Sequence, residues 1–147
     1  MPVVTGRSLA WCWPPYADLF PLRFSIRSKA NADHYWYYDG AIGCITVSDT
    51  QRTSFKISAT NVHAGTIMTG IDAITLTVQH HGFVVPRSPN RPSGAIVLGV
   101  TVRQSEAFIF KFDDLDKGRF VPGKDEPRFP LYYVPQGGVS AGWELVL

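Results

Sequence analysis

Short segments in which apolar and polar residues alternate make up most of the chain. In the segment AITLTVQ (73–79), Ile74, Leu76 and Val78 share one face of an extended strand, and the polar residues between them share the other. This period of two is typical of a β-strand with one buried face. Helical spacing is nearly absent, apart from a turn around 16–20, so the pattern predicts an all-β fold. The other predicted strands are 22–26, 35–38, 44–47, 54–58, 65–68, 82–85, 95–102, 107–112, 119–121, 131–134 and 142–147.

Two segments lack this alternation. Residues 86–94 (PRSPNRPSG) contain three prolines, which predicts an exposed loop. Residues 113–130 are charged and rich in Pro and Gly, which predicts a connection that is mostly solvated. Neither segment has enough strands on each side to close a separate core. We therefore expect a single domain over 1–147, with 1–21 as an N-terminal arm.

Three segments share an ending in which a small residue precedes an aromatic one, followed by any residue and then an apolar one. They are QRTSFKI (51–57), QSEAFIF (104–110) and SAGWELV (140–146). This pattern resembles the β-trefoil, especially the ricin-B-like lectins and small fungal trefoil proteins, whose repeats end in a Trp-x-apolar strand. The resemblance implies pseudo-repeats over about 22–58, 59–112 and 113–147. A jelly-roll or immunoglobulin-like β-sandwich needs the same alternation without a threefold pattern, and it remains the alternative.

Composition and charge narrow the class of protein. Of the 147 residues, 45% are hydrophobic and 18% are charged, which predicts a folded, soluble domain with its own core. The net charge is only +2 and the basic residues are scattered, so no nucleic-acid partner is expected. The sequence predicts no membrane span and no signal peptide. We expect a cytoplasmic protein, with secretion left open, in which Cys12 and Cys44 are reduced thiols rather than a disulfide.

The sequence contains no motif for catalysis, a metal or a cofactor. The four histidines lack metal-ligand spacing, and the adjacent His80 and His81 precede Gly82, where a turn is expected. Neither cysteine has a local signature for activation, and there is no nucleophile elbow or phosphate-binding glycine pattern. The carboxylates at 113, 114 and 116 are interpreted as solvated turn residues. We therefore expect a protein that is not an enzyme, with no cofactor, no metal site and no catalytic residues.

The strongest candidate for a binding site is the segment NADHYWYYDG (31–40). A sugar is recognised by an aromatic face, which packs on the C–H side of the ring, and by polar groups that bind its hydroxyls. Strand alternation places Tyr35 and Tyr37 on one face and Trp36 and Tyr38 on the other, so only one pair faces a ligand. The alternative is that Asp39-Gly40 is only a hairpin turn and a loop covers the aromatics. The predicted carbohydrate-binding residues are Asp33, His34, Tyr35, Trp36, Tyr37 and Asp39, and the predicted partner is a glycan or glycoprotein.

The resemblance to the ricin-B-like lectins is incomplete at the sugar sites. In that family a hairpin aromatic, an early Asp and a Gln-x-Trp motif together form each site. The matching endings here are 53–55 (TSF), 106–108 (EAF) and 141–143 (AGW), so Gln is absent from all three and Trp occurs once. A single or divergent site is therefore expected rather than three.

Two other functions remain open. In the first, the loop 86–94 enters a protease as a substrate mimic, because trefoil inhibitors present a rigid loop and Arg87-Ser88 is a bond that a trypsin-like enzyme recognises. In the second, the protein is a structural or assembly subunit, for example a homodimer. The aromatic segment WCWPPY (11–16) is the anchor for that interpretation.

Overall fold

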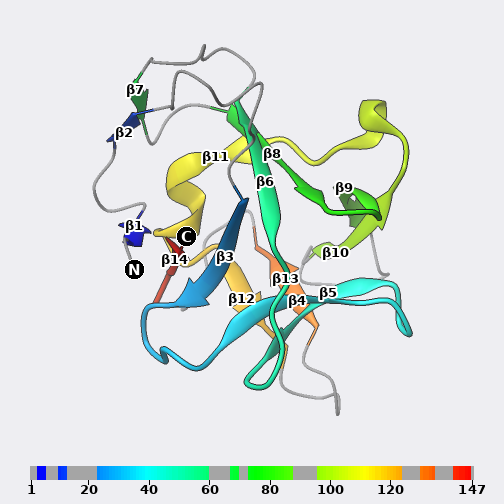
Figure 1. Cartoon of the computed structure of the whole chain (residues 1–147), viewed down its shortest axis with the longest axis horizontal. Helices are drawn as coiled ribbons and strands as arrows, with labels where there is room; N and C mark the ends of the chain where they lie inside the picture. Colours follow the sequence, from blue (N-terminus) through cyan, green and yellow to red (C-terminus); the bar gives the residue numbers. More distant parts are fainter. Residues whose placement is uncertain are drawn as a thin grey trace.

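The computed structural model describes residues 3–5, 10–12, 23–59, 67–69, 73–87, 96–123, 130–134 and 141–146. These residues form β-strands and two short 3-10 helices, with no α-helix among them (Figure 1). The all-β prediction is confirmed. The strands are β1 (Val3–Thr5), β2 (Ala10–Cys12), β3 (Arg23–Ser28), β4 (Tyr35–Asp39), β5 (Cys44–Ser48), β6 (Phe55–Ala59), β7 (Ile67–Thr69), β8 (Ala73–Val78), β9 (Gly82–Arg87), β10 (Ile96–Thr101), β11 (Phe110–Lys111), β12 (Phe120–Pro122), β13 (Leu131–Tyr133) and β14 (Trp143–Val146), and the 3-10 helices are η2 (Gln104–Glu106) and η3 (Phe112–Leu115).

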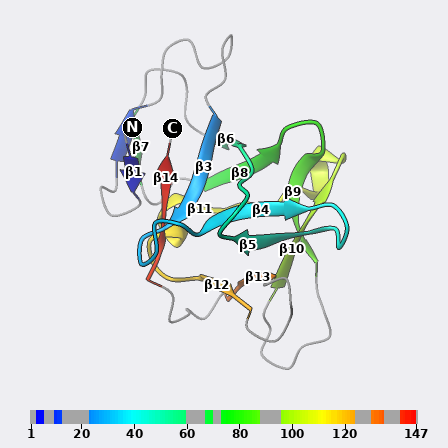
Figure 2. The same ribbon diagram turned by 60° about the horizontal axis from the view of Figure 1, so that its bottom comes forward.

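Seven strands close into an antiparallel barrel. Its order is β3-β4-β5-β10-β9-β8-β6, and β6 pairs with β3 to complete the ring. The barrel thus contains two three-stranded meanders, β3-β4-β5 and β8-β9-β10, which pair through β5 and β10. Both views show the β4–β5 hairpin (cyan) and the β8–β9 pair (green) on the same side of the molecule (Figures 1 and 2).

The remaining strands extend this barrel at its seams. Strand β14 pairs with β3 and carries β1 on its other edge, while β13 pairs with β10 and with β12. Strand β11 pairs with β8, and β2 and β7 form a separate two-stranded sheet. Apart from β1 and β2, which fall in the predicted N-terminal arm, each strand lies in a segment that the alternation predicted. In the segment 107–112 only Phe110 and Lys111 are extended, because the chain then turns into η3.

The barrel interior is filled by the inward residues of each strand. Ile74, Leu76 and Val78 of β8 are all buried, as the alternation predicts. At the centre, Trp36 is completely buried, and its ring centroid lies 5.0 Å from Phe120. Phe55 and Trp143 pack edge-on against the same indole at 6.0 and 5.8 Å. Packing alone holds this indole, because its Nε1 has no hydrogen-bond partner in the structure.

The β-trefoil prediction is not confirmed. The three similar segment endings occupy positions that are not equivalent in the fold. Phe55 begins the barrel strand β6, Phe108 lies in an irregular segment between η2 and β11, and Trp143 belongs to β14, outside the ring of seven. What these aromatics share is burial against the common core.

The segment 113–130 is not the solvated connection that its charge predicted. Asp113 and Asp114 belong to η3 and are both buried. Lys117 Nζ lies 2.9 Å from an Asp113 oxygen, and Arg119 Nε lies 3.1 Å from an Asp114 oxygen. The second Asp114 oxygen accepts a hydrogen bond from the Tyr133 hydroxyl at 3.2 Å. The solvated interpretation of these aspartates is therefore wrong, because nearby cations and donors stabilise their charge inside the protein.

Tyr133 makes stability depend on pH in the alkaline range. Burial raises the pKa of its hydroxyl, and the neighbouring Asp114 carboxylate raises it further. The folded protein therefore holds this proton more tightly than the unfolded chain, whose tyrosines titrate near pH 10, so stability falls as pH rises through that range. We expect the midpoint of urea unfolding to fall less steeply between about pH 9 and 11 in Tyr133→Phe than in the wild type. Parallel curves for the two proteins would contradict this expectation.

Candidate functional site

The predicted aromatic cluster divides between the two faces of β4, as strand alternation requires. Trp36 points into the core, and Tyr38 also packs against the core while remaining partly exposed. Tyr35 and Tyr37 are half-buried on the opposite face. Trp36 is 0% exposed, so its predicted contact with a sugar is replaced by a packing role. Only the outward tyrosines and the rim of Tyr38 remain accessible to a ligand.

The predicted carboxylates and His34 belong to turns. Asp33 is exposed in a turn whose geometry depends on Asn31, and the Asn31 Nδ2 lies 3.3 Å from His34 Nε2. Asp39 begins the β4–β5 turn, where its carboxylate accepts a hydrogen bond from the Ala41 amide at 3.0 Å. Its carbonyl accepts another from the Gly43 amide at 2.8 Å. The expected hairpin turn at Asp39-Gly40 is therefore present, and Asp39 has a local structural role.

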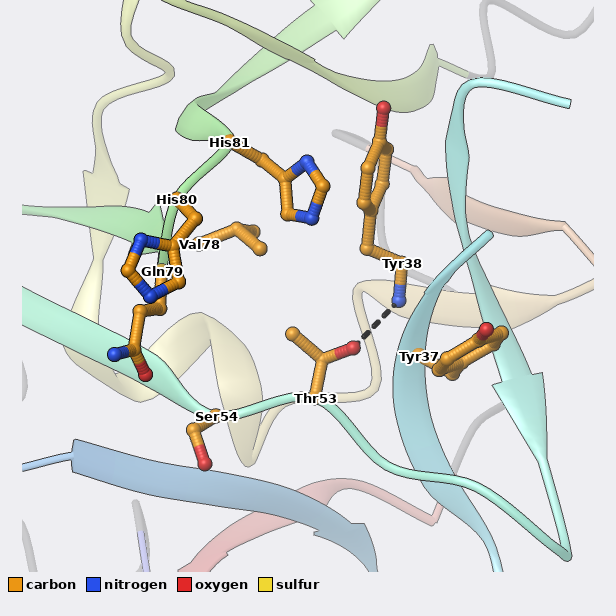
Figure 3. A pocket seen from close by; sticks show the side chains of 8 residues that line it. All are labelled: Tyr37, Tyr38, Thr53, Ser54, Val78, Gln79, His80 and His81. Carbon is orange, nitrogen blue, oxygen red and sulfur yellow. Dashed lines mark hydrogen bonds between the residues drawn. The ribbon is translucent and has the colours of Figure 1, made fainter. Parts of the chain in front are cut away.

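A hollow of about 320 Å³ lies beside this hairpin. Three segments that are distant in sequence line it: the end of β4, the two residues before β6, and the turn between β8 and β9 (Figure 3). Closure of the barrel brings them together, since β6 pairs with β8 over its whole length. The lining residues are Tyr37, Tyr38, Thr53, Ser54, Val78, Gln79, His80 and His81.

Aromatic rings form opposite walls of the hollow. The rings of Tyr38 and His81 face each other with centroids 4.9 Å apart, tilted by 56° (Figure 3). The backbone amide of Tyr38 donates a hydrogen bond to Thr53 Oγ1 at 2.9 Å, which ties β4 to the 53–54 segment. Tyr37 lies on the outer side of the same strand. The result is a cavity with both stacking surfaces and hydroxyl groups.

The turn that presents the histidines has an unusual backbone. The His81 amide donates to the Val78 carbonyl at 3.1 Å, and His80 has a φ of 66°. A positive φ at the third residue of such a turn is the pattern of a type II turn, where Gly or Asn is the usual residue. His80 therefore occupies a conformation that costs of order 1 kcal/mol for its residue type. Gln79, His80 and His81 are all exposed, so the turn presents three polar side chains to solvent.

The sequence-predicted site and this hollow overlap in one residue, Tyr37. Tyr38, the hydroxyl pair at 53–54 and the polar turn at 79–81 were not predicted to bind a ligand. Their only signal in the sequence was His80-His81 ahead of Gly82, which correctly predicted a turn but was considered only as a metal site. Among the described residues, no group of three His, Cys, Asp or Glu side chains is placed to hold a metal ion.

Charge is absent from the walls of the hollow. Among the described residues that line it, there is no aspartate, glutamate, lysine or arginine. The groups available are phenol and alcohol hydroxyls, one carboxamide and two imidazoles, all of which exchange hydrogen bonds with neutral partners. This arrangement suits a neutral ring that carries hydroxyl groups, because its C–H face packs on an aromatic ring while its rim forms hydrogen bonds.

The residues of the alternative hypotheses lie elsewhere. Arg87 ends β9, and its side chain lies over Gly99 of β10, with Nη2 3.5 Å from the Val100 carbonyl. This guanidinium is folded against the sheet rather than projecting as an inhibitor residue would. Ser88 and the segment 13–16 lie outside the described residues. Cys44 is a free, buried thiol whose pKa is raised by burial.

Comparisons of the chain with protein-family models, with curated proteins and with solved structures found no match. The site must therefore be interpreted from its own geometry. In the part of the chain that the structure describes, no helix is long and apolar enough to cross a membrane.

Proposed function

We propose that this protein is a non-enzymatic carbohydrate-binding protein whose site is the hollow between β4 and the β8–β9 turn. The observation that carries the proposal is the composition of the walls: facing aromatic rings, hydroxyls and a carboxamide, without a charged side chain. A saccharide needs both kinds of group in one place. The proposed glycan or glycoprotein partner is the one expected from the sequence, but the site is centred on Tyr37 and Tyr38 rather than on Trp36.

The size of the hollow also supports a small ligand. A volume of about 320 Å³ lies at the lower end of the range for small-molecule sites, roughly 300–1,000 Å³. A single sugar ring is the unit that this space accommodates, and the open side leaves room for the rest of a glycan. The proposal does not depend on the trefoil, which stays a prediction, nor on the inhibitor and assembly functions, for which the described residues add no support.

Replacing Tyr37 with alanine tests the proposal, because it removes one wall of the hollow from an outward, half-buried position. We expect glycan-array screening to identify a bound sugar and Tyr37→Ala to weaken its binding by about tenfold or more, equivalent to about 1.4 kcal/mol. The matched control is Tyr35→Ala, which removes the same side chain from the same face of β4 outside the hollow. Equal losses in both variants, or no binding to any glycan by the folded wild type, would contradict the proposal.

A further inference from the structure

Two half-buried cations face each other on the outer surface of the barrel beside the hollow. Arg23 of β3 lies directly opposite Lys56 of β6, so the two side chains share one face at adjacent positions. Like charges in this position destabilise a pair of strands. Thr77 of β8 is the next residue in the same row, opposite Lys56, so the row itself contains no carboxylate to offset the two charges.

The other half-buried cations differ in having an acidic partner. Five lysines and arginines are half-buried among the described residues. Three of them form ion pairs: Arg27 with Glu144, Lys29 with Asp116, and Arg119 with Asp114. Arg23 and Lys56 do not.

The unpaired state of Arg23 extends to its hydrogen bonds. Its Nη1 is inaccessible to solvent and has no hydrogen-bond partner in the structure. A buried guanidinium donor without an acceptor is unfavourable, and a charged donor more so than a neutral one. The two cations therefore leave an uncompensated positive charge at one defined place on the barrel.

This place adjoins the hollow along two strands. Ser54, which lines the hollow, is the outward residue before Lys56, and Gln79 is the outward residue after Thr77. Outward residues that follow one another on a strand are separated by roughly 6.6 Å, about the length of one sugar ring, and a lysine side chain spans that distance. A ligand seated in the hollow therefore has Lys56, and Arg23 behind it, within reach of a substituent.

We propose that the saccharide bound by this protein is acidic: a neutral ring occupies the hollow, and a carboxylate or sulfate group on the saccharide pairs with Lys56 and Arg23. This inference rests on the proposed function and specifies its ligand class. An anion at this place would neutralise the opposed cations, so acidic saccharides gain binding energy that neutral ones lack. Carboxylate and sulfate share this chemistry, and the choice of ligands in the test separates them.

The test is isothermal titration calorimetry with matched sugars: galactose, galacturonate and galactose 6-sulfate, together with the corresponding glucose series. We expect at least one acidic sugar to bind about tenfold more tightly than its neutral parent, and this advantage to decrease when salt is raised from about 50 to about 500 mM. Lys56→Gln should abolish most of the advantage and leave neutral-sugar affinity unchanged, while Lys56→Arg should preserve it. Arg23→Gln should act in the same direction.

The matched control for charge is Lys111→Gln. Lys111 is exposed and pairs with Ala73 at the opposite end of β8 from the hollow, so its loss makes the same change in net charge elsewhere. Equal affinity for neutral and acidic sugars, or an advantage that survives Lys56→Gln, would overturn the acidic ligand and leave the carbohydrate site standing. Binding of neither class by the folded protein would overturn both proposals.

Discussion

Replacing Trp36 with alanine is expected to lower the free energy of unfolding by about 3–5 kcal/mol. The indole is completely buried and contacts three other large aromatic side chains, so its removal leaves a cavity at the centre of the barrel. Close-packed walls of Phe and Trp relax only partly into such a space. Since a domain of this size is stable by roughly 5–15 kcal/mol, the variant retains at most a fraction of its stability.

Urea unfolding followed by circular dichroism measures this loss, and Tyr35→Ala provides the comparison. Tyr35 precedes Trp36 in β4 but points outward, with Arg52 over its ring at 5.2 Å. Its removal should cost no more than about 1 kcal/mol, because only a partly exposed contact is lost. If the two neighbours cost the same, the assignment of one to the core and the other to the surface is wrong.

The strands could be predicted from the sequence because the physical cause of the pattern is local. A strand with one buried face must alternate, and β8 shows this pattern as clearly in the letters AITLTV as in its burial. The same rule correctly divided YWYY into an inward and an outward pair. It could not reveal how strands far apart in sequence pair, which is why similar aromatic endings predicted a threefold fold. Phe55 and Trp143 resemble each other because both pack on Trp36.

The candidate site was harder to predict because it is a product of barrel closure. Tyr38, Ser54 and His81 are separated by dozens of residues and meet only when β6 pairs with β8 and β4 returns through β5. The opposed charges of Arg23 and Lys56 depend on pairing in the same way. The buried aspartates of η3 show the converse: local charge predicted solvation, while distant partners made burial possible.

Gly82 links the stability of the barrel to the shape of the hollow, and Gly82→Ala is expected to disrupt both. Gly82 follows His81 directly and has a φ of +125°, a region that residues with a Cβ rarely adopt. A Cβ at this position would overlap the carbonyl oxygen of Thr101 and lie 2.8 Å from its carbonyl carbon. Both obstacles are backbone, so the turn must move, and we expect a loss of roughly 2–4 kcal/mol in the free energy of unfolding.

Gly99→Ala is the matched control, because there too a Cβ would overlap an existing atom. The obstacle at Gly99 is the Arg87 side chain, with its Cδ at 2.6 Å and Cζ at 2.9 Å, and Gly99 itself has no positive φ. A flexible arginine can rotate away into solvent, so this substitution should cost less than about 1 kcal/mol. Urea unfolding of both variants measures the difference, and sugar binding should weaken only in Gly82→Ala, since only that residue positions His81. Equal destabilisation by the two alanines would mean that the β8–β9 turn is free to rearrange, and the hollow would then not be a preformed site.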